Sequence, residues 1–278
     1  MAAITDLSDL INRSTGGNNG TPQNVFFYKA PRIAGVAATA PTTGRMASLW
    51  RYDGIPSGGA TPTTVVAPTN ATQGALPFTN AGGSRESWMT QAFATSSAFG
   101  TYILYDRLLQ IGGLSGIVTT AQTVGGTLTR NTGGTGNFAF LEIDTLIGAT
   151  SANVTMTYTD QSGNTGNVST AVQVGGTGFR EATRAIMLSL AAGDTGVRAI
   201  DSITLSASTG TAGNIGVVIG RPLAYLTVGQ TGAAGWRDFV TGLPSIPKIE
   251  ANSCLSILFL SGGTAVPEMF GGYSIIEA

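Results

Sequence analysis

The feature that most constrains this chain is a series of short apolar runs, separated by turn residues, that begins near residue 101. The stretch 154–174 (VTMTYTDQSGNTGNVSTAVQV) is typical, because Val154, Met156 and Tyr158 alternate with threonines before a cluster of Gly and Asn. Alternation places one set of side chains on one face of a sheet, and Gly and Asn supply the positive φ angles that hairpin turns need. This stretch predicts a β-hairpin. The whole series predicts a mainly β protein, with an antiparallel β-sandwich of jelly-roll type over residues 101–278.

The first hundred residues have a different character. Ile4, Leu7, Leu10 and Ile11 recur at helical spacing and predict a short helix, with Thr5 as its N-cap. Residues 23–100 are dominated by Pro, Gly, Ala and Thr and lack the periodicity of a packed domain. We therefore expect residues 1–100 to form an extended N-terminal arm that binds partners, and a chain beginning at residue 101 to fold without it. Residues 87–99 are also compatible with a helix.

Composition indicates a folded protein with a weakly charged surface. The chain of 278 residues is 42% hydrophobic, has 40 glycines, and carries only 10% charged residues with a net charge of −1. Disordered chains are poor in apolar residues and strongly charged, so this chain is expected to fold. A surface with few charges suits a protein whose faces are covered by neighbours, which favours a homo-oligomer. Compositional drift in a GC-rich genome accounts for the same bias equally well.

Several kinds of chemistry are excluded by what the sequence lacks. There is no histidine, which removes Ser–His–Asp and Cys–His arrangements, and the one cysteine, Cys254, lies in the apolar run CLSILFL and is expected to be a buried, inert thiol. No phosphate-binding loop occurs, so we expect no cofactor, no metal and no enzymatic activity. Scattered arginines and a slightly negative net charge argue against nucleic acid as a partner. No apolar run is long enough to cross a membrane, and the N-terminus does not resemble a signal peptide, so synthesis in the cytoplasm is expected.

Glu142 and Asp144 are candidates for a carbohydrate-directed function. They lie two residues apart in FAFLEIDTL and share the parity of Phe138 and Phe140, so all four are expected on one strand face. Such a pair could bind a cation or act in catalysis, because a glycosidase needs only two carboxylates. Since β proteins that cleave polysaccharides usually line their grooves with aromatic residues, Phe138 and Phe140 keep a carbohydrate-binding or carbohydrate-cleaving β-sandwich as the alternative function. The simpler interpretation, a solvated strand face, is favoured.

Aromatic residues beside Arg or Lys stand out in the first hundred residues, in VFFYK, SLWRYDG and SRESWMTQAF. Aromatic residues, Met and Arg are enriched at the cores of protein interfaces. We therefore predict a partner-binding role for Phe26, Phe27, Trp50, Arg51 and Trp88. Docking of the same residues on the protein's own sandwich is an equally good interpretation.

The stretches ATPTTVVAPTNATQGALPF, LYDRLLQIGGLSGIVTTAQTV, GDTGVRAIDSITLSASTGTAGN and WRDFVTGLPSIP resemble virion structural proteins of tailed bacteriophages, and the resemblance covers most of the chain. It implies a decoration or cement protein on the capsid surface, with the major capsid protein and copies of itself as partners. A tail or head-fibre component is the alternative within the same class. The resemblance implies no functional residue.

Overall fold

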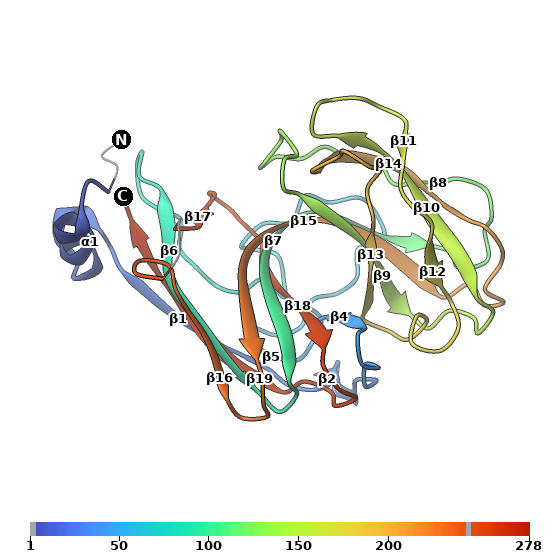
Figure 1. Ribbon diagram of the computed structural model, residues 1–278, viewed down its shortest axis with the longest axis horizontal. Helices are drawn as coiled ribbons and strands as arrows, with labels where there is room; N and C mark the ends of the chain where they lie inside the picture. Colours follow the sequence, from blue (N-terminus) through green and yellow to red (C-terminus); the bar gives the residue numbers. More distant parts are fainter. Residues whose placement is uncertain (1–3, 243–245) are drawn as a thin grey trace.

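The computed structural model describes residues 4–242 and 246–278, and within them the chain is mainly antiparallel β, with 44% strand and 4% helix. Three layers follow one another along the long axis of the molecule (Figure 1). We call them the terminal sheet, which contains the first and the last strand, the central barrel, and the hairpin sheet, which contains the hairpin 154–174. The mainly β fold class and the antiparallel, sandwich-like layering expected from the sequence are confirmed.

The terminal sheet, at the left of Figure 1, joins the two ends of the chain. Its strands follow the order β16-β6-β19-β1-β5, and β17 pairs with β6. The strands are β1 (Gln23–Lys29), β5 (Gly54–Ile55), β6 (Ser87–Ser96), β16 (Ala234–Asp238), β17 (Lys248–Ile249) and β19 (Met269–Glu277).

The central barrel is closed, in the order β13-β4-β18-β7-β15-β9. Its two longest strands, β7 and β15, have 15 residues each and pair along their whole lengths. The barrel strands are β4 (Met46–Ser48), β7 (Gly100–Leu114), β9 (Phe138–Thr145), β13 (Arg184–Leu188), β15 (Asn214–Val228) and β18 (Leu255–Ser261). Closure removes exposed strand edges, which are a liability for aggregation.

The hairpin sheet lies at the other end of the molecule and confirms the predicted hairpin, because β10 pairs with β11 and β12. Its strands are β8 (Gln122–Thr123), β10 (Ala152–Asp160), β11 (Asn167–Val168), β12 (Val172–Val174) and β14 (Val197–Leu205). Val154, Met156 and Tyr158 all point into the core, as their alternation with threonine predicts.

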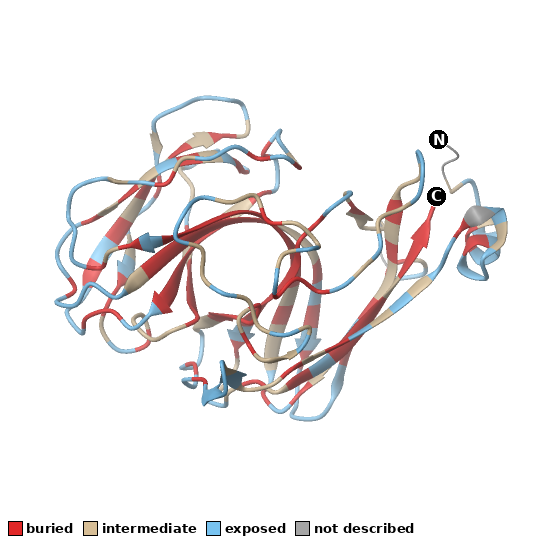
Figure 2. Ribbon diagram, turned by 180° about the vertical axis from the view of Figure 1, so that it is seen from behind, coloured by how far each residue is buried: buried red, intermediate tan, exposed pale blue. Residues whose placement is uncertain are grey.

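The long strands β7 and β15 pack against both outer layers. Near its start, β7 packs Tyr102 and Leu104 against the terminal sheet, whereas Leu109 and Ile111 near its end pack against the hairpin sheet. Tyr105 lies between these two groups and packs in the barrel interior. Figure 2 shows these strands buried along most of their length. One pair of strands therefore connects the cores of all three layers.

The predicted N-terminal helix is present as α1 (Leu7–Ser14), with Asp6 rather than Thr5 as its N-cap. The Asp6 carboxylate accepts the backbone N–H of Asp9 at 2.8 Å. The buried Arg13 donates to the carbonyl of Glu277 at 3.3 Å, which ties the helix to the last strand. The remaining short elements are the 3-10 helix η1 (Gly17–Asn19) and the ribbon of β2 (Arg32–Ile33) and β3 (Val36–Ala37).

The structure differs from the arm expected over residues 1–100 and the separate domain expected over 101–278. Strands β1 and β6 both pair with β19 in the terminal sheet, and β4 pairs with β13 and β18 in the barrel. The Pro- and Gly-rich segments are loops between these strands. The helix considered for residues 87–99 is instead the strand β6 and its following turn. Because the partners of β1, β4 and β6 lie more than a hundred residues away, no local pattern reveals the pairing.

Candidate functional site

The outer face of the terminal sheet carries a group of exposed aromatic and aliphatic side chains. One row runs straight across four strands, because Phe26 on β1 is opposite Gly272 on β19, Gly272 is opposite Phe93 on β6, and Phe93 is opposite Trp236 on β16. Directly opposed residues of antiparallel strands point to the same face. The exposed fractions are 52% for Phe26, 42% for Phe93 and 61% for Trp236.

A second row extends this surface. Tyr28 on β1 lies between Phe270 on β19 and Ile55 on β5, and the rings of Tyr28 and Phe270 are 4.8 Å apart. Phe270 and Ile55 are exposed, and Tyr28 is half-buried and donates its hydroxyl to Glu268 at 2.7 Å. We call the two rows together the aromatic face, made up of Phe26, Tyr28, Ile55, Phe93, Trp236 and Phe270.

Glycine at position 272 gives the aromatic face its flat centre. A Cβ atom there would lie 2.8 Å from Cε1 of Phe93, closer than such atoms approach, so the Phe93 ring lies directly over the Gly272 backbone. The Phe93 ring is therefore held against the backbone of β19, and the rings of Tyr28 and Phe270 are held against each other. Rigid aromatic anchors lose little conformational entropy when a partner covers them.

Polar residues bound the aromatic face toward α1. Ser274 on β19 donates to Asn24 on β1 at 2.7 Å and accepts from Gln91 on β6 at 2.8 Å. Beyond this polar row, Leu7, Leu10 and Ile11 of α1 line a small hollow together with Gln91 and neighbouring residues. The sheet face thus has an apolar half that is open and a polar half that lies next to the helix.

The five predicted partner-binding residues are divided between surface and interior. Phe26 belongs to the aromatic face, and Trp88 is half-buried on β6 opposite Ile276. Phe27 and Trp50 are buried, and the side chain of Arg51 is 13% exposed, so these three contact the protein's own core. The prediction is wrong for the three for two reasons. Phe27 lies on the face of β1 opposite to Phe26. Trp50 and Arg51 lie in a turn after β4 and bond to Glu142 and Asp144 in the barrel. Partner binding by Phe26 and Trp88 stays a prediction.

Sequence reasoning missed Phe93, Trp236 and Phe270 as part of this surface. A usable signal was present, because Phe93 stands between two alanines and Phe270 and Trp236 each adjoin glycines. Such alternation of large and small residues is typical of a strand that packs closely on one side only.

A second group of functional candidates, Glu142 and Asp144, lies inside the central barrel. As predicted, these carboxylates share a strand face with Phe138 and Phe140. That face points into the barrel, where Glu142 is 0% and Asp144 1% exposed. The interpretation as a solvated strand face is therefore wrong, and neither carboxylate reaches a polysaccharide in solvent.

Trp50 and Arg51 partner the two buried carboxylates. The Trp50 Nε1–H donates to both oxygens of Glu142, at 2.9 and 3.0 Å, and the guanidinium of Arg107 lies 4.1 Å from the Trp50 ring centroid. Arg51 Nη1 donates to the backbone carbonyl of Asp144 at 2.6 Å and lies 3.7 Å from its Oδ1. Arg51 and Arg107 offset the charge of the carboxylates, as buried charges require.

Burial changes the protonation of this pair. Desolvation, followed by the neighbouring Glu142 carboxyl, raises the pKa of Asp144 to about 8. Desolvation also raises the pKa of Glu142, and the Trp50 hydrogen bond offsets part of that rise. Burial therefore favours the protonated form of Asp144, which leaves fewer negative charges inside the barrel. A carboxyl held neutral in this way is common at active sites and also occurs in structural networks.

The loop 56–77 covers this polar end of the barrel. Thr61 donates to Asp144 at 3.3 Å, Val66 forms an isolated β-bridge with Gln110, and Leu76 N–H donates to the carbonyl of Leu255 at 2.8 Å. Gly59 allows the loop to approach the Trp50 indole, because a Cβ there would lie 2.3 Å from its ring. The loop excludes solvent from the carboxylates, which explains their burial.

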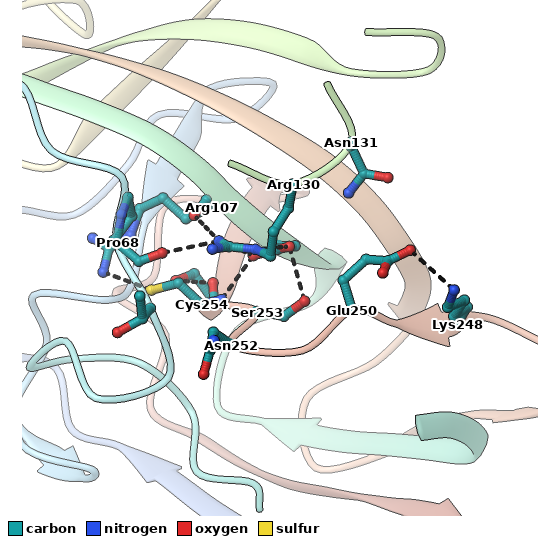
Figure 3. A network of polar contacts seen from close by, with 12 residues as sticks. Pro68, Arg107, Arg130, Asn131, Lys248, Glu250, Asn252, Ser253 and Cys254 are labelled. Atoms are coloured by element: carbon teal, nitrogen blue, oxygen red, sulfur yellow. Dashed lines mark hydrogen bonds and ion pairs between the residues drawn. The ribbon is translucent and has the colours of Figure 1, made fainter. Parts of the chain in front are cut away.

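A third polar network joins β7 to the loop before β18 (Figure 3). Arg130 makes two hydrogen bonds of 3.0 Å to the Asp106 carboxylate and one of 2.9 Å to the carbonyl of Pro68. Asp106 also accepts from the hydroxyl of Ser253 at 2.9 Å and from the N–H of Cys254 at 2.7 Å. Cys254 is a buried free thiol, as predicted, and its sulfur lies 3.2 Å from Arg107 Nη2. These contacts satisfy Asp106 fully and indicate a structural role.

Among residues 4–242 and 246–278, no group of three or more Cys, Asp or Glu side chains is arranged to hold a metal ion. Within the same ranges, no helix is long and apolar enough to cross a membrane.

Comparisons with known proteins do not identify the function. No protein-family model and no curated protein matches the chain. Among solved structures, 93% of the chain aligns with 81% of a chain of infectious bursal disease virus, Gt strain, at 11% identity and a TM-score of 0.18. The VP2 subviral particle of infectious bursal disease virus aligns over the same shares at 9% identity and a TM-score of 0.18. Scores this low do not indicate a shared fold.

Proposed function

We propose that this chain is a structural protein of a virion, which decorates a capsid and stabilises it through protein–protein contacts as a homo-oligomer. The observation that carries the proposal is the aromatic face. Fully covering one aromatic side chain buries roughly 150–250 Å². Half-exposed rings in two adjacent rows therefore offer an apolar area on the order of a few hundred Å², the size of the largest and often functional patch on a monomer.

The composition of the remaining surface supports the same proposal. Charged residues make up 10% of the chain, and the hairpin sheet alternates its buried residues with threonines such as Thr155 and Thr157. A hydroxyl is easier to desolvate than an ammonium or a carboxylate and needs only one hydrogen bond. Such a surface can be covered by neighbouring subunits with a small desolvation penalty. The resemblance to virion structural proteins of tailed bacteriophages agrees with this role.

The proposal assigns no catalytic step to the chain. The alternative, carbohydrate cleavage by Glu142 and Asp144, requires both carboxylates to contact substrate, and loop 56–77 covers them. The variant Glu142→Gln/Asp144→Asn would leave any polysaccharide cleavage by purified particles unchanged. Loss of cleavage in this variant, with its fold intact by circular dichroism, would assign catalysis to the barrel.

The proposed role is tested on purified virus particles. Mass spectrometry of the particles should detect the chain in many copies, and gold-labelled antibody against it should mark the outside of the heads in negative stain. Sedimentation velocity of the isolated protein should show an oligomer. Absence of the chain from particles, or labelling confined to tails, would contradict a decoration role.

A further inference from the structure

The end of the barrel opposite loop 56–77 opens into a pocket of about 480 Å³. Ile103 of β7, Phe138 of β9 and Met187 of β13 form its floor, and each is half-buried while its neighbours along the strand are fully buried. Tyr225 of β15, which pairs with Ile103, stands at the rim. The volume lies within the range of about 300–1,000 Å³ that small-molecule sites occupy.

The floor of this pocket is rigid and aromatic. The Phe138 ring stacks on Phe140 with centroids 6.0 Å apart and lies 5.6 Å from the ring of Tyr105. Phe140 and Tyr105 are both fully buried in the barrel core, so Phe138 cannot collapse inward to close the pocket. A preformed apolar cavity of this kind binds a compact hydrocarbon or aromatic group.

Asp194 presents an unpaired acceptor oxygen in the lining. Tyr158 donates its hydroxyl to Oδ2 of Asp194 and accepts the N–H of Ala191 at 2.8 Å, which fixes the carboxylate at the rim. No hydrogen bond or ion pair to Asp194 Oδ1 occurs within the described residues. Asn137 uses its amide N–H groups on the carbonyls of Asn131 and Val197, each at 3.1 Å, and its Oδ1, which has no donor in the same part of the chain, is buried, so Asn137 has a structural role.

The charged side chain in the pocket lining is acidic. Asp194 is a charged lining residue, and no lysine or arginine lines the cavity in the part of the chain that the structure describes. The lining therefore favours a group that places an N–H donor and positive charge beside Asp194 and an apolar body against Phe138. Phe138 and Tyr225 line the same cavity, and aromatic rings attract positive charge through their faces.

We propose that this pocket is a binding site for an organic cation, an ammonium or guanidinium group on a compact apolar stem, with Asp194 as its counter-ion. The proposal is independent of the proposed function. The shared chemistry has two sources, a free amine or a Lys or Arg side chain of a partner protein.

The test uses the full chain labelled with ¹³C at methionine methyl groups and titrated with benzylammonium, benzyl alcohol and benzoate. These probes have similar shapes and differ in charge. The methyl signal of Met187, assigned with Met187→Leu, should move with benzylammonium, while Met89 in the terminal-sheet core stays fixed. Benzylammonium should bind about tenfold or more tightly than the other two, the factor expected for one well-placed charge contact.

Asp194→Asn keeps the shape of the site and removes its charge, so it should abolish the preference for benzylammonium. The control Asp201→Asn removes an exposed carboxylate on β14 and should leave binding unchanged. Tyr225→Ala, at the rim, should weaken benzylammonium and benzyl alcohol together. N-acetylarginine amide and N-acetyllysine amide then distinguish the source: binding by them points to a partner side chain, and binding by free amines alone points to a small molecule. Equal binding of the three probes, or an unchanged preference in Asp194→Asn, would overturn the proposal.

Discussion

The indole N–H of Trp50 donates to both carboxyl oxygens of Glu142 inside the barrel, at 2.9 and 3.0 Å. Trp50 follows β4, near the start of the chain, and Glu142 lies on β9, so this contact ties the N-terminal third to the barrel wall. Both residues are fully buried. The contact explains why an aromatic residue that resembles an interface anchor in the sequence belongs to the interior.

Trp50→Phe should lower the free energy of unfolding by about 2–4 kcal/mol, because it opens a cavity and leaves the Glu142 carboxyl without its donor. Urea unfolding followed by circular dichroism measures the change. The matched control is Trp88→Phe, on the half-exposed tryptophan of β6, which should lose no more than about 1 kcal/mol. Similar losses in the two variants would contradict the structural role of Trp50.

The raised pKa of Asp144 should make the free energy of unfolding depend on pH. Its pKa is about 8 in the folded chain against an ordinary value of 3.8, so unfolding releases a proton between these two values. Stability from this group is complete at low pH and is lost as pH rises toward about 8. Asp144→Asn should flatten the decline of the urea midpoint between about pH 5 and pH 8, whereas the exposed control Asp201→Asn should not. A slope unchanged by Asp144→Asn would show that this carboxyl is ionised in the folded protein.

The ion pair of Asp106 and Arg130 should be much stronger than the surface pair of Glu86 and Lys248. Arg130→Met removes one partner of a buried pair and should lower the free energy of unfolding by about 3–5 kcal/mol. Lys248→Met removes one partner of a pair whose side chains are 36% and 26% exposed, and should change it by about 0–1 kcal/mol. Adding Asp106→Leu to Arg130→Met should recover part of the loss, since no unpaired charge then remains buried. No recovery in the double variant would mean that Asp106 acts mainly through Ser253 and Cys254.

A chain that begins at residue 101 should fail to fold, contrary to the expectation from the sequence. It lacks β1 and β6, between which β19 lies, and β4, which joins β13 to β18 in the barrel. The lost strands uncover core residues such as Tyr102 and Phe259. Far-UV circular dichroism and solubility of this fragment are the measurement, and a soluble fragment with a cooperative unfolding transition would restore the arm hypothesis.

Local sequence patterns predict the local features of this fold. The alternation around Met156 predicts the hairpin, the helical spacing around Leu10 predicts α1, and the apolar run around Cys254 predicts its burial. Each depends on neighbours within a few residues along the chain.

The features that sequence reasoning missed depend on long-range pairing. Phe26 and Phe27 are adjacent, and which of them faces solvent is decided by the pairing of β1 with β19, about 250 residues away. Closure of the barrel, which buries Glu142, likewise depends on β9 meeting both β13 and β15. The sequence shows that Phe138, Phe140, Glu142 and Asp144 share one strand face. It does not show that the other barrel strands enclose this face.

Binding of the aromatic face to a capsid is tested by co-sedimentation of the purified protein with capsids that lack it. The variant Phe93→Ser/Trp236→Ser removes the centre of the aromatic face without altering a buried core residue, and Leu146→Ser/Val168→Ser removes comparably exposed apolar residues near the hairpin sheet. The account predicts that the wild type and the second variant pellet with the capsids, and that the first variant stays in the supernatant with its fold intact by circular dichroism. Equal pelleting of all three proteins would contradict the claim that the aromatic face binds the capsid.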